Sequence, residues 1–160
     1  MPAIHEAARV EKNCALLLRC AAELRLPVIV TEQYSARLGA TLPSLQELVP
    51  EFSAVDKMLF SACVAPVRDA LEASGRRTVL LCGVEAHVCV LQTALDLVEA
   101  GYTVFAARDA LSSRTPENWN IGWERMMRAG VWPTSTESAV FELLGEAGTP
   151  EFKALLSFIK

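Results

Sequence analysis

Cys89 is the residue of this chain whose position best suits covalent chemistry. It follows an apolar run at 78–82, a turn that contains Gly83 and the first residues of a helix expected from Ala86. Its sulfur should therefore lie near backbone N–H groups at a helix start, where a thiolate is favoured. The same N–H groups could bind the oxyanion that forms when a thiolate attacks a carbonyl. On position alone, a small buried thiol in an apolar helix is the alternative, because buried free cysteine is common.

Lys57 and His87 are the basic side chains that could assist Cys89. Lys57 lies in the segment 55–61, where a cation beside an apolar stretch could be half-buried and favour ionisation of a neighbouring thiol. A solvated loop lysine is the alternative. His87 is two residues from Cys89, and side chains two apart on a helix point to different faces. We therefore do not expect a direct cysteine–histidine pair.

Two arginines and an aspartate follow a later apolar run. Arg108 and Arg114 could each bind a substrate carboxylate through two hydrogen bonds, although surface ion pairs explain most such arginines. Asp109 is expected to cap the loop after its strand rather than to contact a ligand. The two histidines, His5 and His87, join no cluster of acids or cysteines with the spacing of metal ligands. No metal is therefore expected.

Composition narrows the class of protein. The chain has 160 residues, 52% of them hydrophobic and 21% charged, which suits one globular domain with a sizeable core. The net charge of -4 gives no basic field, so a nucleic acid partner is not expected. Five cysteines without a C-x-x-C pair, and no leader-like start, indicate a reducing, cytoplasmic location. The apolar runs are far shorter than the roughly 20 residues that span a bilayer, so no membrane partner is expected.

The elements that must position these residues alternate between helix and strand. The apolar pattern predicts helices over 3–24, 64–74, 86–100 and 115–129 and from about 136 and 150, and strands over 28–30, 78–82, 102–107 and 131–134. The segment 35–52 is expected to be a loop with a short helix. This alternation predicts an α/β fold, a three-layer α/β/α sandwich around a mostly parallel, Rossmann-like sheet. The site should then lie beyond the carboxyl ends of the strands.

Four segments resemble the isochorismatase-like cysteine hydrolases. The segment 80–90, LLCGVEAHVCV, resembles that family's G-V-x-x-x-x-C-V signature, and 57–62, KMLFSA, resembles its K-x-x-F-S-A segment. The segments 31–34, TEQY, and 109–114, DALSSR, match its pattern in the same order. The resemblance covers nearly the whole chain and is greatest to the isochorismatase domain-containing branch.

The resemblance implies a catalytic triad of cysteine, lysine and aspartate. The carboxylate would take the thiol proton, and the lysine would stabilise the charged pair. Cys89 and Lys57 are the residues that match the first two roles. The resemblance also implies a cis peptide between Val84 and Glu85, which would direct the N–H groups of Glu85 and Cys89 at the oxyanion. The pocket would be lined by Glu32, Gln33, Tyr34, Phe60, His87 and Arg114.

The third member of the triad has no match. In the family the aspartate lies in an apolar V-I-D-x-Q-type strand before the first helix, and no such segment occurs here. The resemblance therefore implies a single isochorismatase-like hydrolase domain over residues 1–160 without the family's first strand. Either the sequence is part of a longer chain or the domain departs from its relatives. Asp56, Glu32 and Glu85 are possible substitutes for the missing acid.

Two functions follow from the resemblance. The first is hydrolysis of a small amide-like or related molecule by Cys89, with no metal and no other cofactor. The family's nicotinamidases carry an Asp and His metal cluster where this chain has Thr31 to Tyr34, so that activity is not expected. The second is a catalytically weakened or inactive binding or scaffold domain of the same fold. A homo-oligomer is also expected, because relatives commonly assemble and Trp119, Trp123 and Trp132 suit a core or an interface.

Overall fold

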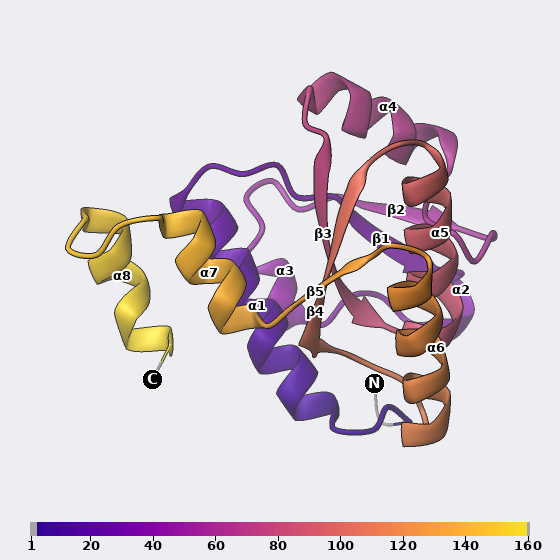
Figure 1. Ribbon diagram of the computed structural model, residues 1–160. Helices are drawn as coiled ribbons and strands as arrows, with labels where there is room; N and C mark the ends of the chain where they lie inside the picture. Colours follow the sequence, from indigo (N-terminus) through magenta and orange to yellow (C-terminus); the bar gives the residue numbers. More distant parts are fainter. Residues whose placement is uncertain (1–2, 160) are drawn as a thin grey trace.

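A computed structural model of the chain describes residues 3–159, and its helices and strands alternate as expected (Figure 1). In chain order they are α1 Ala7–Glu23, β1 Val30–Gln33, α2 Ser35–Leu38, α3 Pro43–Gln46, β2 Ala54–Lys57, α4 Ala65–Ser74, β3 Thr78–Val84, the π-helical turn η1 Ala86–Val90, α5 Leu91–Glu99, β4 Thr103–Ser112, α6 Pro116–Arg128, β5 Trp132–Thr134, α7 Thr136–Leu144 and α8 Pro150–Ile159. Across residues 3–159, no helix is both long and apolar enough to cross a bilayer.

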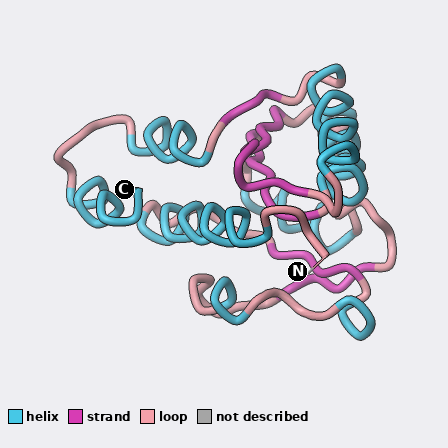
Figure 2. Tube along the Cα trace, turned by 90° about the horizontal axis from the view of Figure 1, so that it is seen from below, coloured by secondary structure: helices cyan, strands magenta, loops and turns pink. Residues whose placement is uncertain are grey.

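Helices cover both faces of the parallel strands, which confirms the predicted α/β class. The helices α1, α7 and α8 lie on one side, and α4, α5 and α6 lie on the other (Figure 1); Figure 2 shows from below that strands run between the two groups. One hydrophobic core includes Val10, Val140 and Leu155, and the other includes Leu91 and Met126. The strand β4 pairs with both β3 and β5, so it is the central strand of the larger sheet, and it contributes buried residues to both cores.

The strands form two sheets rather than the one sheet expected. Within residues 3–159, β1 pairs only with β2, and a separate sheet has the order β3-β4-β5. All of these pairings are parallel. Each sheet therefore has an edge strand, β1 or β3, whose second edge makes no backbone ladder in the part described. The carboxyl ends of these strands fall within the segments 31–34 and 83–89, two of those in which the site was expected.

Near the site, one predicted strand is shifted and one strand was not predicted. The strand expected over 28–30 lies instead over Val30–Gln33, because its pairing with β2 begins at Val30 opposite Ala54. The strand β2 itself was not predicted, since only four residues form it and two of these, Asp56 and Lys57, are charged. Lys57 is thus the last residue of a strand and not part of a loop.

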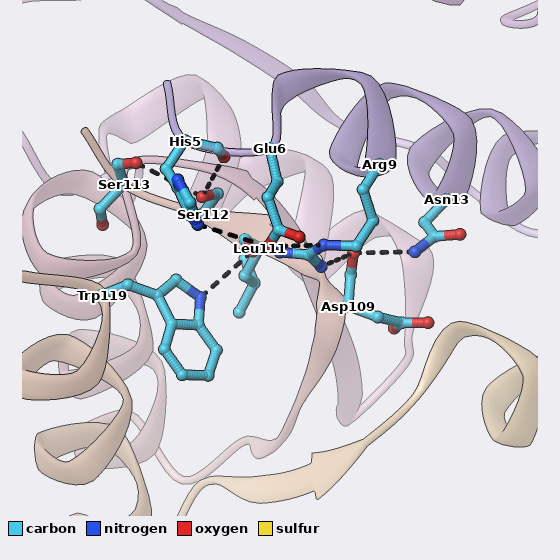
Figure 3. A network of polar contacts seen from close by, with 9 residues as sticks. All are labelled: His5, Glu6, Arg9, Asn13, Asp109, Leu111, Ser112, Ser113 and Trp119. Carbon is cyan, nitrogen blue, oxygen red and sulfur yellow. Dashed lines mark hydrogen bonds and ion pairs between the residues drawn. The ribbon is translucent and has the colours of Figure 1, made fainter. Parts of the chain in front are cut away.

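The strand β4 is longer than predicted. Side chains from α1 and α6 donate hydrogen bonds to the backbone carbonyl oxygens at its carboxyl end. The strand β5 pairs with β4 only over 105–107. Beyond this point the Arg9 guanidinium and the Asn13 amide donate to the carbonyl oxygen of Asp109, and the Trp119 indole N–H donates to that of Leu111 at 3.1 Å (Figure 3). Asp109 therefore lies inside a strand, so the predicted cap on the following loop was wrong.

The same network explains why α1 begins at Ala7 rather than at the predicted Ala3. The backbone N–H of His5 donates to the Ser113 carbonyl at 2.9 Å, and the Ser112 hydroxyl donates to the His5 carbonyl at 2.6 Å (Figure 3). These bonds hold His5 against the end of β4. The chain turns into the helix at Glu6, which has a left-handed φ of 51°.

Candidate functional site

Cys89 lies in a π-helical turn that joins β3 to α5. A regular helix was predicted over 86–100, but its first five residues form η1, in which the Val90 N–H donates to the Glu85 carbonyl at 3.2 Å. Such wide turns are rare in proteins overall, and those that occur often lie at functional sites. The turn follows Gly83, whose φ of 109° suits glycine, and a cis peptide bond between Val84 and Glu85.

A threonine fixes the backbone of this turn. The Thr93 hydroxyl donates to the Cys89 carbonyl at 2.7 Å and accepts from the Ala62 N–H at 2.8 Å. Thr93 is buried, so both bonds are shielded from water. The side chain therefore ties the segment that contains Cys89 to the loop after β2. Sequence reasoning missed Thr93, although its place four residues after Cys89 on one helix face was a usable signal.

Gln33 connects Cys89 to Lys57. The amide oxygen Oε1 of Gln33 accepts from the Lys57 ammonium at 2.6 Å and from the Cys89 thiol at 3.7 Å. The other end of the amide, Nε2, donates to the Met58 carbonyl at 2.9 Å. Gln33 and Lys57 are paired across the last position of the β1–β2 ladder, which brings their side chains to the same face of that sheet. The structure thus brings together three of the residues expected at the site.

Lys57 is buried, with 5% of its surface exposed. Besides the bond to Gln33, its ammonium donates to the carbonyl oxygens of Leu59 at 3.1 Å and Phe60 at 2.8 Å. An ammonium has three N–H donors, so all of them are engaged. The alternative of a solvated loop lysine is wrong. Among residues 3–159, no carboxylate oxygen lies within 4.0 Å of the Lys57 ammonium.

The three acids considered as substitutes for the triad aspartate all have other partners. Glu32 accepts from the Thr41 N–H at 2.7 Å, and Asp56 accepts from the Ser35 N–H at 2.9 Å. These two residues are paired in the β1–β2 ladder one position before Gln33 and Lys57, so they point to the opposite face. Glu85 forms an ion pair of 3.0 Å with Arg114.

The other residues expected to line the pocket do not take part in the contacts among Cys89, Gln33 and Lys57. The ring nitrogen Nδ1 of His87 lies 3.0 Å from the Ser113 hydroxyl, and the structure shows no hydrogen bond between His87 and Cys89. The Arg114 side chain is 60% exposed beside Glu85. Tyr34 and Phe60 are exposed, at 39% and 52%.

Two further residues flank this region without joining it. The Arg108 guanidinium lies 4.9 Å from the ring centre of Trp119, so it stacks on an aromatic side chain. Asp109 accepts at Oδ1 from the N–H and the hydroxyl of Thr136, and it therefore caps the start of α7. This is a structural role, as expected, but with a partner that the sequence did not reveal.

Gly122 allows α6 to pack directly against η1. A Cβ atom at this position would lie 2.7 Å from the Cα atom of His87 and 2.8 Å from both the His87 nitrogen and the Ala86 oxygen. Atoms this close overlap, and all three belong to the backbone. Gly122 therefore sets the position of the turn that carries Cys89. A glycine inside an expected helix was the only signal in the sequence.

Two other cysteines have pKa values raised by burial. Burial raises the pKa of the Cys20 thiol to about 11, and burial also raises the pKa of the Cys63 thiol above its ordinary value. Both thiols are thus held in the protonated form at neutral pH. All five cysteines are free. Within residues 3–159, no three side chains of His, Cys, Asp or Glu are grouped as metal ligands.

Comparison with known proteins gives the family. The sequence profile described as Isochorismatase domain matches residues 1–138. A secreted isochorismatase effector of Phytophthora sojae is 46% identical over 142 residues, which cover 86% of this chain and 68% of the relative. The isochorismatase domain-containing protein 2 of Bos taurus is 38% identical over 155 residues, 95% of this chain and 74% of the relative. The structure described as the MAR1 ribonuclease of Caenorhabditis elegans is 37% identical, covers 99% of this chain and 82% of its own, and superposes with a TM-score of 0.93. The chain therefore belongs to the isochorismatase family.

Proposed function

We propose that this member of the isochorismatase family is a hydrolase in which Cys89 attacks a small amide-like or related substrate without a metal. The observation that carries the proposal is the chain of contacts from the Cys89 sulfur through Gln33 to the buried Lys57 ammonium. A cation held in a poorly solvated place favours a nearby anion more strongly than it would in water. Lys57 thus supports the ionised form of the nucleophile.

The proposed reaction is acyl transfer to sulfur followed by hydrolysis. After the Cys89 thiol gives its proton to solvent water, the sulfur lone pair forms the C–S bond and the carbonyl electrons move to oxygen. The backbone N–H groups of Glu85 and Cys89 hold this oxyanion in the proposal. The C–N bond then breaks, the amine leaves with a proton, and water cleaves the thioester to restore the thiol.

Site-resolved labelling with iodoacetamide, combined with turnover of a panel of small amides, tests the proposal. At neutral pH we expect Cys89 to be labelled about tenfold or more faster than Cys63, and we expect Cys89→Ser to abolish turnover of any amide that the protein hydrolyses. Cys63→Ser is the matched control and should retain turnover. Labelling of Cys89 no faster than that of Cys14 or Cys63 would rule out an activated nucleophile.

The second candidate is a binding or scaffold domain that does not catalyse the reaction. It is favoured by one observation, namely that Glu32, Asp56 and Glu85 are all engaged away from Lys57. A nucleophile without a nearby base ionises less readily, so turnover would fall even with the site otherwise intact. This candidate predicts saturable binding of a small ligand, measured by calorimetry, without hydrolysis of that ligand.

We propose a small molecule rather than RNA as the substrate, although one similar structure is described as a ribonuclease. The net charge of -4 supports this choice, because proteins that bind RNA usually present a basic surface. The arginines next to the site are also occupied, Arg114 by Glu85 and Arg108 by Trp119. Degradation of single-stranded RNA that is lost in Cys89→Ser would contradict this proposal.

We further propose that the chain is one domain, that it forms a homo-oligomer and that it works in the cytoplasm. Leu155 of α8 packs in the same core as Val10 of α1, which supports one domain.

Met58 and Leu59 are each 66% exposed next to the site, which supports an interface between copies of the chain. Five free cysteines suit a reducing compartment. Light scattering after size exclusion and fluorescence microscopy of a tagged full-length protein test the last two points.

A further inference from the structure

We propose that Cys14 of α1 and Cys82 of β3 form a disulfide bond when a peroxide oxidises the protein, and that a thiol such as glutathione reduces it again. In the structure both residues are free cysteines. Neither takes part in the contacts among Cys89, Gln33 and Lys57, so the inference does not depend on the proposed function. Disulfides in a reducing compartment are usually transient and redox-sensing, as this one would be.

The geometry of β3 directs the Cys82 side chain toward α1. Side chains along a strand alternate between its two faces. Leu80 and Val84, two residues to either side of Cys82, pack against the core that contains Cys14, whereas Leu81 packs against the other core. The irregular pairing at this point adds residues to β4 and not to β3, so the alternation along β3 is unbroken. Cys82 therefore lies on the face that α1 covers.

The contacts of the Cys14 sulfur place it at the same point of the sheet. Its thiol donates to the Ala110 carbonyl oxygen at 3.7 Å. Ala110 directly precedes Leu111, which pairs with Gly83, so it lies beside Cys82 on the neighbouring strand. The Cys14 sulfur also accepts from the Gly83 N–H, and the Cys14 and Cys82 thiols are hydrogen-bonded to each other. The two sulfur atoms are thus neighbours, as a disulfide requires.

The two thiols differ in exposure and in acidity. Cys82 is exposed, whereas Cys14 is buried, with 6% of its surface exposed. The hydrogen bond between them lowers the pKa of the Cys82 thiol below its ordinary value, and the same bond, together with burial, raises the pKa of the Cys14 thiol. Peroxides react with the thiolate form of an accessible cysteine. Cys82 is therefore the thiol that is oxidised first, and Cys14 is the thiol that resolves the product.

Hydrogen peroxide supplies the oxidising power in two steps. In the first, the Cys82 sulfur attacks one peroxide oxygen, the O–O bond breaks, and the hydroxide that leaves takes the thiol proton to become water. The product is a sulfenic acid on Cys82. In the second, the Cys14 sulfur attacks the Cys82 sulfur, the S–S bond forms and the S–O bond breaks, and the leaving hydroxide takes the Cys14 proton as water. Two thiols are oxidised, and one peroxide is reduced to two waters.

The test treats the reduced full-length protein with equimolar hydrogen peroxide at neutral pH. Remaining thiols are blocked with N-ethylmaleimide, and peptides are identified by mass spectrometry without reduction. We expect the link between Cys14 and Cys82 to form about tenfold or more faster than any other cysteine pair, and to disappear with dithiothreitol. In concentrated urea this preference should be lost, because the fold brings the two sulfur atoms together. Random pairing of the five cysteines in the folded protein would overturn the inference.

Variants separate the two roles. In Cys14→Ser, the sulfenic acid on Cys82 has no resolving thiol, so we expect dimedone to trap it about tenfold or more strongly than in the unmodified protein. In Cys82→Ser, we expect neither the link nor dimedone labelling of Cys14. Cys20→Ser, which removes another buried thiol of α1, is the matched control and should form the link at an unchanged rate. If Cys14→Ser does not fold, Cys14→Ala gives the same comparison.

Two further outcomes would contradict the inference. Equal dimedone labelling of Cys82 with and without Cys14 would show that Cys14 does not resolve the sulfenic acid. Loss of the link in Cys89→Ser would show that Cys89 is the thiol that peroxide oxidises first. An unchanged link in Cys89→Ser, in a protein that hydrolyses no amide, would leave this inference intact while the proposed function fails.

Discussion

Replacing Gly122 by alanine tests whether close packing of α6 sets the position of η1, the turn that carries Cys89. The added Cβ atom would lie 2.7–2.8 Å from three backbone atoms of Ala86 and His87. Backbone atoms cannot rotate out of the way, so either α6 or η1 must shift. Overpacking of this kind costs about 1–3 kcal/mol, and three backbone contacts place the cost near the upper end. Alanine regains about 1 kcal/mol through its better helix propensity.

The net loss of stability should thus be about 2 kcal/mol, which lowers the melting temperature by about 4–8 °C for a chain of this length. Calorimetry and circular dichroism measure this change. We also expect slower iodoacetamide labelling of Cys89, because the displaced backbone lies two residues before it. Asn120→Ala, at an exposed position on the same helix, is the control: it should raise stability by about 0.5 kcal/mol through helix propensity alone and leave Cys89 labelling unchanged. A Gly122→Ala variant that melts higher than the unmodified protein would refute the reasoning.

Three other predictions concern groups around this centre. In Asp109→Ala, loss of the cap on α7 should lower the free energy of unfolding, measured in urea, by about 1–3 kcal/mol and leave Cys89 labelling unchanged. An unchanged urea midpoint would contradict the role of Asp109 as a cap. In Thr93→Val, we expect a similar loss of stability together with altered labelling of Cys89, whereas Thr93→Ser should behave normally, and equal behaviour of the two variants would exclude the hydroxyl. Since burial raises the pKa of Cys20 to about 11, the folded protein retains this proton up to a higher pH than the unfolded chain does, so stability should fall between about pH 9 and 11 by up to about 3 kcal/mol. This fall should be smaller in Cys20→Val, and a melting temperature that falls equally in both proteins would assign it to other groups.

The sequence predicted the order of helices and strands well because most elements bury long apolar faces. The strands β3 and β4 were recognised from continuous apolar runs, and the N-cap of α6 from Thr115, whose hydroxyl accepts from the Asn118 N–H at 3.2 Å. The strand β2 was missed because its four residues show no apolar pattern of their own. The division into two sheets was also missed, since pairing between strands depends on contacts that local patterns do not encode.

The candidate site was predicted in its residue types but not in its connections. Lys57, Cys89 and Gln33 were each identified, the first two with roles and the third only as a pocket residue. Their linkage through one amide depends on strand register, which places Gln33 opposite Lys57, and a shift of one residue would put Glu32 there instead. The contribution of Gly122 was missed, because a glycine inside a predicted helix does not reveal which backbone it contacts.

The two halves of the site belong to separate sheets, and this has a consequence for motion. Lys57 and Gln33 are carried by β2 and β1, whereas Cys89 follows β3, and in the part of the chain described no backbone ladder crosses from one sheet to the other. Their spacing thus rests on a few side-chain contacts, among them those of Gln33 and Thr93. Segments joined in this way separate at a lower free energy than segments joined by a ladder. We therefore expect amide hydrogens along β1 to exchange with solvent sooner than those of β4, as hydrogen exchange read by mass spectrometry would show.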